Sequence, residues 1–161
     1  MNDESLRLLA DGMLGRLAKW LRLLGYDTAY DKTASDPELA HRARAEGRVL
    51  LTRDRELSAR RGLRTLLIQS EVLEEQVREV QDGLGPPPHP PLSRCAVCNA
   101  VLEHLSPAEV ADRVPPYVLS TQTEFRYCPG CGRVYWPGSH LRAMRSQMEK
   151  FTRPHRGEPC V

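Results

Sequence analysis

The chain of 161 residues, with 40% hydrophobic and 27% charged residues, is long enough to bury one substantial core, which excludes disorder throughout. The formal net charge of +2 is modest. No stretch has the roughly 18 consecutive apolar residues of a membrane span. The sequence starts with acidic Asp3 and Glu4 where a signal peptide is basic, so we expect a cytoplasmic protein that does not act in a membrane.

Residues 1–85 alternate short apolar runs with segments of helical periodicity, a pattern typical of an α/β domain with a mainly parallel sheet. Gly25 is suited to end the first helix, and either Ser35 or Asp36 to cap the second. The expected strands are 6–10, 26–30, 48–52 and 63–69, and the expected helices are 14–25, 35–47, 54–61 and 71–80.

Acidic residues follow the ends of two of these strands. Asp11 follows the first strand and Asp54 the third, and ligands bind open α/β sheets at this edge. Asp36 and Glu38, at the start of the intervening helix, reach the same edge if the first and third strands are neighbours. Grouped carboxylates repel one another unless cations neutralise them, so the pattern indicates a Mg²⁺ or Mn²⁺ site. The alternative is structural: Asp36 and Asp54 are good N-caps, and Asp11 suits the turn before Gly12.

Motifs for other phosphate chemistry are missing from the chain. Leu9 stands where a haloacid-dehalogenase phosphatase has its nucleophilic aspartate, so aspartyl-phosphate chemistry is disfavoured. The chain has neither a Gly-x-Gly-x-x-Gly nor a Walker loop, which disfavours a dinucleotide or nucleoside-triphosphate site.

A proline-rich segment, residues 86–92, separates this half of the chain from a second module. Five of the 13 prolines fall within six positions, so neither a helix nor a central strand continues there, and we expect a stiff linker. We expect a zinc ribbon with a C-terminal helix in residues 93–150 and a disordered tail in residues 151–161.

The second module contains two Cys-x-x-Cys pairs separated by 29 residues. Two such pairs present four thiolates to one tetrahedral zinc ion, and no position remains for water, so the zinc is expected to be structural. The four expected ligands are Cys95, Cys98, Cys128 and Cys131.

Aromatic and basic side chains alternate around the second cysteine pair. Tyr127, Tyr135 and Trp136 lie beside Arg126 and Arg133, an arrangement that can stack on single-stranded nucleic acid. In the alternative interpretation the aromatic residues form the small core of the ribbon.

Several stretches carry a family resemblance. They are residues 10–22, 24–28 and 50–54, the two cysteine pairs, and residues 134–140. In order and spacing they resemble the Mut-seven-C ribonuclease domain family, over nearly the whole chain from Leu6 to Arg142. This resemblance implies a fold similar to the PIN nucleases, a three-layer α/β/α domain with a mainly parallel sheet, followed by a zinc ribbon.

The resemblance also implies roles for the acidic residues. By position, Asp11 would be the carboxylate of the first strand, Asp54 that after the third, and Asp36 or Glu38 the acid at the helix start; together they would bind Mg²⁺ or Mn²⁺. The final acidic position of PIN nucleases has no counterpart, because the acids after the fourth strand are expected on a helix surface.

The function that these expectations favour is a metal-dependent ribonuclease, in which the carboxylates hold ions that activate water and stabilise the leaving oxygen. The zinc ribbon would help to bind substrate. Arg53, beside Asp54, is a candidate phosphate contact. Arg16, Lys19 and Arg22 are further candidates, with a solvated helix face as the alternative.

Two other hypotheses remain. A non-catalytic RNA-binding or adaptor protein with a degenerate PIN-like fold would bind RNA independently of divalent metal and of the carboxylates. A partner-dependent toxin is disfavoured, because a toxin has little use for an appended zinc module. RNA is the expected partner and DNA stays open, while the sequence does not determine the RNA target, endonucleolytic or exonucleolytic action, or the oligomeric state.

Overall fold

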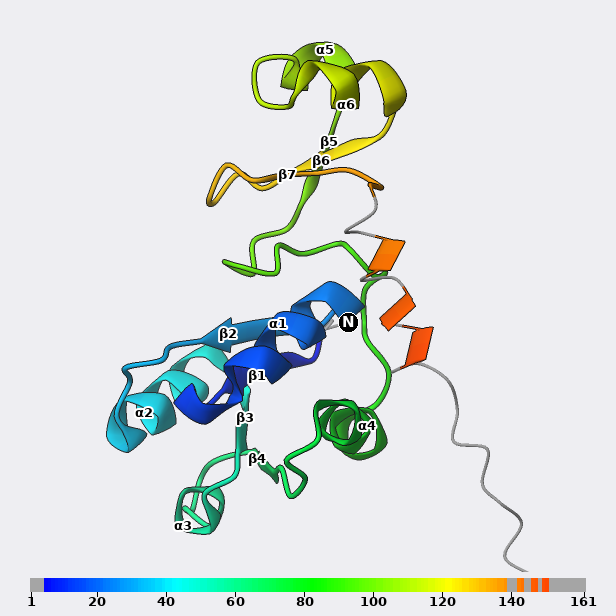
Figure 1. The fold of residues 1–161 in the computed structure, drawn as a ribbon. Coiled ribbons are helices and arrows are strands. Elements are labelled where there is room, and N and C mark those ends of the chain that lie inside the picture. Colours follow the sequence, from blue (N-terminus) through cyan, green and yellow to red (C-terminus); the bar gives the residue numbers. More distant parts are fainter. Residues whose placement is uncertain (1–4, 139–141, 144–145, 148, 151–161) are drawn as a thin grey trace, which may run out of the picture.

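The structure, a computed structural model, describes residues 5–138, 142–143, 146–147 and 149–150 of the chain. Its first half contains a four-stranded parallel sheet with the strand order β2-β1-β3-β4 (Figure 1). The strands are β1 (Arg7–Ala10), β2 (Asp27–Tyr30), β3 (Val49–Thr52) and β4 (Thr65–Leu67). The helices are η1 (Gly12–Leu14), α1 (Gly15–Leu24), α2 (Asp36–Glu46), α3 (Arg55–Ser58) and α4 (Leu73–Leu84).

Helices cover both faces of this sheet, because each central strand is apolar on both sides. Leu8 and Leu51 pack with buried residues of α1 and α4 in one cluster. Leu9 and Leu50 point to the opposite face, where they pack with residues of α2 and α3. A strand buried on both faces reads as a continuous apolar run, which is how β1 and β3 appear in the sequence. The predicted α/β class is confirmed.

Local sequence signals set several helix ends. Gly25 has a φ of 110°, in the left-handed region, and ends α1 as predicted. Ser35, rather than Asp36, caps α2, and its side chain and that of Glu38 form a capping box.

Two predicted helix ranges are wrong. α3 ends at Ser58 instead of residue 61, since the chain then turns through Gly62, with a φ of 76°, into β4. α4 runs from Leu73 to Leu84 instead of 71–80, because its apolar face continues to Leu84 against the core.

The second half contains a three-stranded antiparallel sheet of β5 (Glu103–Leu105), β6 (Phe125–Tyr127) and β7 (Val134–Tyr135). The long spacer between the cysteine pairs holds α5 (Pro107–Val110) and α6 (Pro116–Thr121). Figure 1 shows these two helices at the end of the second half that is farthest from the parallel sheet. Val110, Val118 and Phe125 form its small apolar core.

The described residues between 142 and 150 are helical. The tail predicted for residues 151–161 lies outside the described residues. None of the helices in the described part of the chain is both long and apolar enough to span a membrane.

The proline-rich segment lies against the end of α1. The Leu92 N–H donates to the Leu23 carbonyl at 2.9 Å, and the Tyr26 hydroxyl donates to the Gly85 carbonyl at 2.7 Å. A Cβ at Gly25 would lie 2.0 Å from the His89 carbonyl oxygen, so only glycine allows this approach. Segment 86–92 is therefore packed against the first half, and the division into domains there stays a prediction.

The side chain of Arg22 joins the two halves. It is 6% exposed; its Nε donates to the Thr28 carbonyl at 2.8 Å, and Nη1 donates to the carbonyls of Ala96 and Val97 at 3.0 Å each. The prediction that Arg22 contacts phosphates is therefore corrected, because the first cysteine pair covers this end of α1. Burial lowers the pKa of this guanidinium from its usual value.

Asn99 makes a second junction, at the edge strand β2. Its Oδ1 accepts from the Thr28 N–H at 3.0 Å, and its Nδ2 donates to Asp27 Oδ1 at 2.7 Å. Asp27 also pairs with Arg48 at 2.8 Å and with Arg94 at 3.7 Å. Burial acts to raise the pKa of Asp27, but the bonds from Arg48 and Asn99 outweigh burial and hold it below its usual value. Asn99, directly after the first cysteine pair, thus binds the edge strand β2 of the parallel sheet.

Candidate functional site

Asp11 and Asp54 meet at the carboxyl edge of the parallel sheet. Asp11 follows β1, and its N–H donates to the Leu51 carbonyl of β3 at 3.0 Å. The Thr52 hydroxyl donates to Asp11 Oδ2 at 2.8 Å and accepts from the Asp54 N–H at 3.0 Å. One threonine hydroxyl therefore links the carboxylate of Asp11 to the backbone of Asp54 across the neighbouring strands β1 and β3.

Both carboxylates also cap helices, so the structural alternative describes part of their role. Oδ1 of Asp11 accepts from the Met13 N–H at 3.3 Å at the start of η1. Oδ1 of Asp54 accepts from the N–H groups of Glu56 and Leu57 at 2.8 and 3.2 Å. No hydrogen bond from the described residues reaches Oδ2 of Asp54, which leaves this oxygen for a cation or water.

Asp36 and Glu38 lie at the start of α2, which follows the outer strand β2. Glu38 Oε2 accepts from the Ser35 N–H at 2.7 Å and is thereby used in the capping box. Asp36 is exposed in the first turn. In the described part of the chain, the ligand atoms of Asp11, Asp36 and Asp54 are not gathered within 4.8 Å of one another; only the four cysteines form such a group. Thr52 links Asp11 to Asp54, whereas no hydrogen bond among the described residues links Asp36 to either of them.

Arg53 and Glu71 also lie at this edge. Arg53 Nη2 lies 3.4 Å from Glu71 Oε1, and Arg53 Nε has no hydrogen-bond partner among the described residues. Glu71 follows β4 and precedes α4, so the expectation that it belongs to a helix surface is wrong. Arg16 and Lys19 are exposed on α1.

The four cysteines form a site suited to one zinc ion. All four sulfur atoms lie within 4.8 Å of one another, and the Cys95 and Cys131 sulfurs are 3.7 Å apart. A tetrahedral ion with Zn–S bonds of about 2.3 Å separates its ligands by about 3.8 Å, so the arrangement fits.

The environment of Cys95 favours the thiolate that zinc requires. Burial acts to raise the pKa of Cys95, but a hydrogen bond from the Tyr135 hydroxyl, 3.1 Å away, and the N–H groups of Cys98 and Val97 lower it to about 7. Burial and this bond raise the pKa of Tyr135.

The family model of the Mut7-C RNAse domain matches residues 6–148, which include both the acidic edge and the four cysteines. The chain belongs to this family. No curated protein and no solved structure matches it. The matched residues include the parallel sheet and most of the second half of the chain, so one family model spans both halves.

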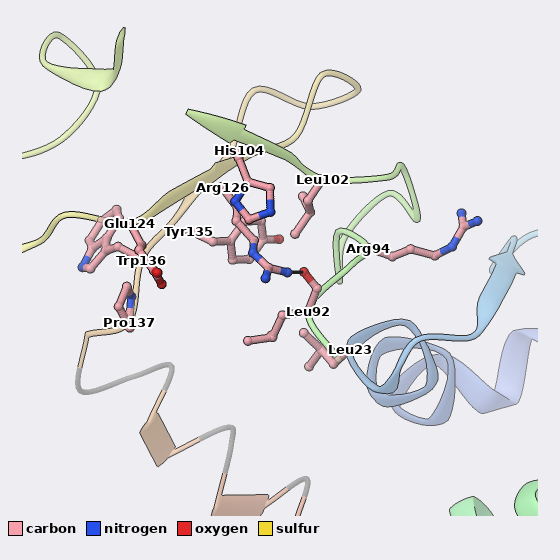
Figure 2. A pocket seen from close by; sticks show the side chains of 10 residues that line it. All are labelled: Leu23, Leu92, Arg94, Leu102, His104, Glu124, Arg126, Tyr135, Trp136 and Pro137. Atoms are coloured by element: carbon pink, nitrogen blue, oxygen red, sulfur yellow. Dashed lines mark hydrogen bonds between the residues drawn. The ribbon is translucent and has the colours of Figure 1, made fainter. Parts of the chain in front are cut away.

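The aromatic residues of this Mut7-C chain form part of the ribbon's packing. Trp136 packs against the apolar core of the second half, and the guanidinium of Arg113 lies 4.6 Å from the ring centre of Tyr127. Figure 2 shows Tyr135 and Trp136 at a pocket that Leu23 of α1 helps to close. Its volume is about 40 Å³. For Trp136, the core interpretation describes the packing better than the stacking interpretation.

Sequence reasoning missed the role of Thr52 at the site. It stands two positions before Asp54, and the N–H of Asp54 donates to its hydroxyl in a local turn. The spacing of two positions between Thr52 and Asp54 is a signal that the sequence contains. The bond from Thr52 to Asp11 cannot be predicted from the sequence, because it depends on the pairing of β1 with β3.

Proposed function

We propose that this Mut7-C RNAse domain chain is a metal-dependent ribonuclease with a PIN-like fold that hydrolyses RNA phosphodiester bonds at the carboxyl edge of β1 and β3. The observation that supports this most strongly is the link from Asp11 through the Thr52 hydroxyl to Asp54. Mg²⁺ usually keeps several waters and binds proteins through one or two carboxylates plus substrate phosphates. Two aspartates at an open edge of the sheet are therefore enough protein ligands for such an ion.

Asp11 and Asp54 would hold the Mg²⁺ or Mn²⁺ ion. Such an ion supplies Lewis-acid charge that generates the attacking hydroxide and stabilises the leaving oxygen. Thr52 fixes the orientation of Asp11 by donating to Oδ2, while the turn at Asp54 directs its second oxygen away from the helix cap. Positioned ligands of this kind need no rearrangement when substrate binds.

The other residues have supporting roles in this proposal. Arg53 would bind a substrate phosphate, since its side chain is 29% exposed and its chain neighbour is Asp54. Arg16 and Lys19 would contact phosphates farther along the strand. Asp36 would add negative charge at the outer part of the edge, and Glu38 is left out because the capping box uses it.

The zinc ribbon would be structural and would help to bind the substrate. Four thiolates around zinc persist in a reducing compartment, which supports a cytoplasmic location.

A second candidate is a non-catalytic RNA-binding protein with the same fold. The helix-capping bonds of Asp11 and Asp54 favour it, because both residues have a structural use without any metal.

RNA cleavage distinguishes the two candidates. Labelled single-stranded RNA is incubated with the zinc-loaded full chain in Mn²⁺, in Mg²⁺ or in neither, without a chelator that would remove zinc, and labelled DNA is tested in parallel. We expect products only with divalent metal. RNA that is bound but never cut under all three conditions would contradict the ribonuclease and support the RNA-binding candidate.

A further inference from the structure

An arginine-lined cavity opens at the amino edge of the parallel sheet, opposite the acidic edge. It lies between the end of α2 and the loop that leads into β4, and its volume is about 300 Å³. We call it the arginine cavity. Its defining residues are Arg44, Arg48, Arg64, Gly47 and Gly62.

Two turns, each formed at a glycine, shape the arginine cavity. Gly47 and Gly62 have φ values of 63° and 76°, a left-handed conformation that favours glycine. A Cβ at Gly47 would meet nothing within 4 Å, so this wall is open. Arg44 holds the opposite wall, because its Nη2 and Nε donate to the carbonyls of Arg61 and Gly62 at 3.0 and 3.4 Å.

The charge at the arginine cavity is positive and largely uncompensated. Arg48 is neutralised locally, since it pairs with Asp27 at 2.8 Å and with Glu46 at 3.2 Å. Arg44 and Arg64 are exposed and form no ion pair with any described residue, and the same holds for nearby Arg60 and Arg61.

The sequence around Arg60, Arg61 and Arg64 contains no compensating acid. Residues 57–70 include three arginines and neither aspartate nor glutamate. A cavity with this lining favours an anionic ligand.

The arginine cavity and the acidic edge lie at the two ends of the same strand. The chain leaves the carboxyl edge at Asp54, passes through α3 and returns to the amino edge at Arg64, where β4 starts parallel to β3. β3 has 4 residues and is therefore about 13 Å long. A single phosphate group is too small to contact both ends of β3. A polyanionic chain that runs along α3 is long enough to contact both.

We propose that the arginine cavity binds the phosphodiester backbone of the RNA strand, a few nucleotides from the bond that is cut. The identity of the polymer rests on the proposed function, and the contact itself is electrostatic and needs no divalent metal. Arg44 and Arg64 would each neutralise one phosphate, with Arg60 and Arg61 at the margin. Such contacts fix the register of the strand without reading its bases.

Fluorescence anisotropy with a labelled single-stranded RNA tests this inference on the zinc-loaded full chain, without divalent metal so that no cleavage occurs. The test variant is Arg44→Gln/Arg64→Gln. The control is Arg42→Gln/Arg78→Gln, which removes the same charge from arginines paired with Glu46 and Glu74 on α2 and α4. Thermal unfolding of both variants checks that each is folded.

We expect the test variant to bind RNA about tenfold more weakly than wild type at low salt. The slope of log K against log salt should fall in magnitude by about 1.4, because each single-strand phosphate that an arginine neutralises adds about 0.7 to it. The control should bind within about twofold of wild type.

Equal binding by the test and control variants overturns the inference. Displacement of the RNA by uridine monophosphate, at concentrations where inorganic phosphate has no effect, also overturns it, because it would indicate a mononucleotide pocket. Weakened binding by the test variant together with no cleavage by wild type in Mn²⁺ would keep this inference and overturn only the nuclease.

Discussion

Asp11→Asn is expected to lower the rate of Mn²⁺-dependent RNA cleavage by about a thousandfold, since an ion held by this carboxylate contributes several kcal/mol to transition-state stabilisation. Asparagine has the same size, and its carbonyl oxygen still accepts from Thr52 or Met13. The change therefore removes charge while it preserves local structure. The initial rate under single-turnover conditions measures the effect.

Asp54→Asn is expected to reduce cleavage to a similar extent for the same reason. Asparagine caps helices as well as aspartate does, so α3 and the stability of the protein should be kept. Glu56→Gln is the matched control, because Glu56 is an exposed acid in the first turn of the same helix and contributes its N–H, not its carboxylate, to the site. Wild-type rates in both aspartate variants would remove the acidic edge from the mechanism.

Loss of the zinc site is expected to destabilise the whole chain, including the half that contains no cysteine ligand. Cys98→Ser leaves three thiolates, and a structural zinc ion in such small modules contributes about 10–16 kcal/mol of apparent binding free energy that is coupled to folding. Without the ion, the first cysteine pair no longer fixes the carbonyls that Arg22 binds or the Asn99 side chain that covers β2. We therefore expect a lower Tm together with faster hydrogen exchange at the Thr28 amide.

The control for this prediction is Cys160→Ser, which makes the same chemical change at a cysteine outside the two Cys-x-x-Cys pairs. It should keep the zinc content, the Tm and the Thr28 exchange rate of wild type. Cys98→Ser with unchanged zinc content and unchanged Tm would show that the four cysteines do not share an ion. Zinc loss with unchanged exchange at Thr28 would show that the junction at β2 does not depend on the metal.

The features that the sequence predicts well are those that neighbouring residues determine. Gly25 ends α1 because its own backbone adopts a positive φ, and Ser35 and Glu38 start α2 through bonds across three positions. The four cysteines can be assigned because two short knuckles carry the ligands. Apolar runs predict the parallel strands. Because Asp11 and Asp54 each follow one of these runs, the sequence also predicts that they lie at the same edge of the sheet.

The features that the sequence does not predict depend on contacts between distant residues. Arg22 looked like a cation on a solvated helix face, but its partners Ala96 and Val97 are 74 and 75 positions away. Asp27 and Asn99, which meet across 72 positions, gave no signal for the same reason. The first and third strands are neighbours, yet no group of three carboxylates forms among the described residues, because the path of the chain between β2 and α2 is not set by local patterns.

Paramagnetic broadening by Mn²⁺ in an amide NMR spectrum of the zinc-loaded chain tests whether a divalent cation binds between Asp11 and Asp54. We expect the signals of Asp11, Thr52 and Asp54 to broaden at the lowest Mn²⁺ concentrations, and Asp11→Asn to weaken this effect greatly. Broadening that begins elsewhere, for example near Glu71 between β4 and α4, or broadening that is unchanged in Asp11→Asn, would contradict cation binding between Asp11 and Asp54.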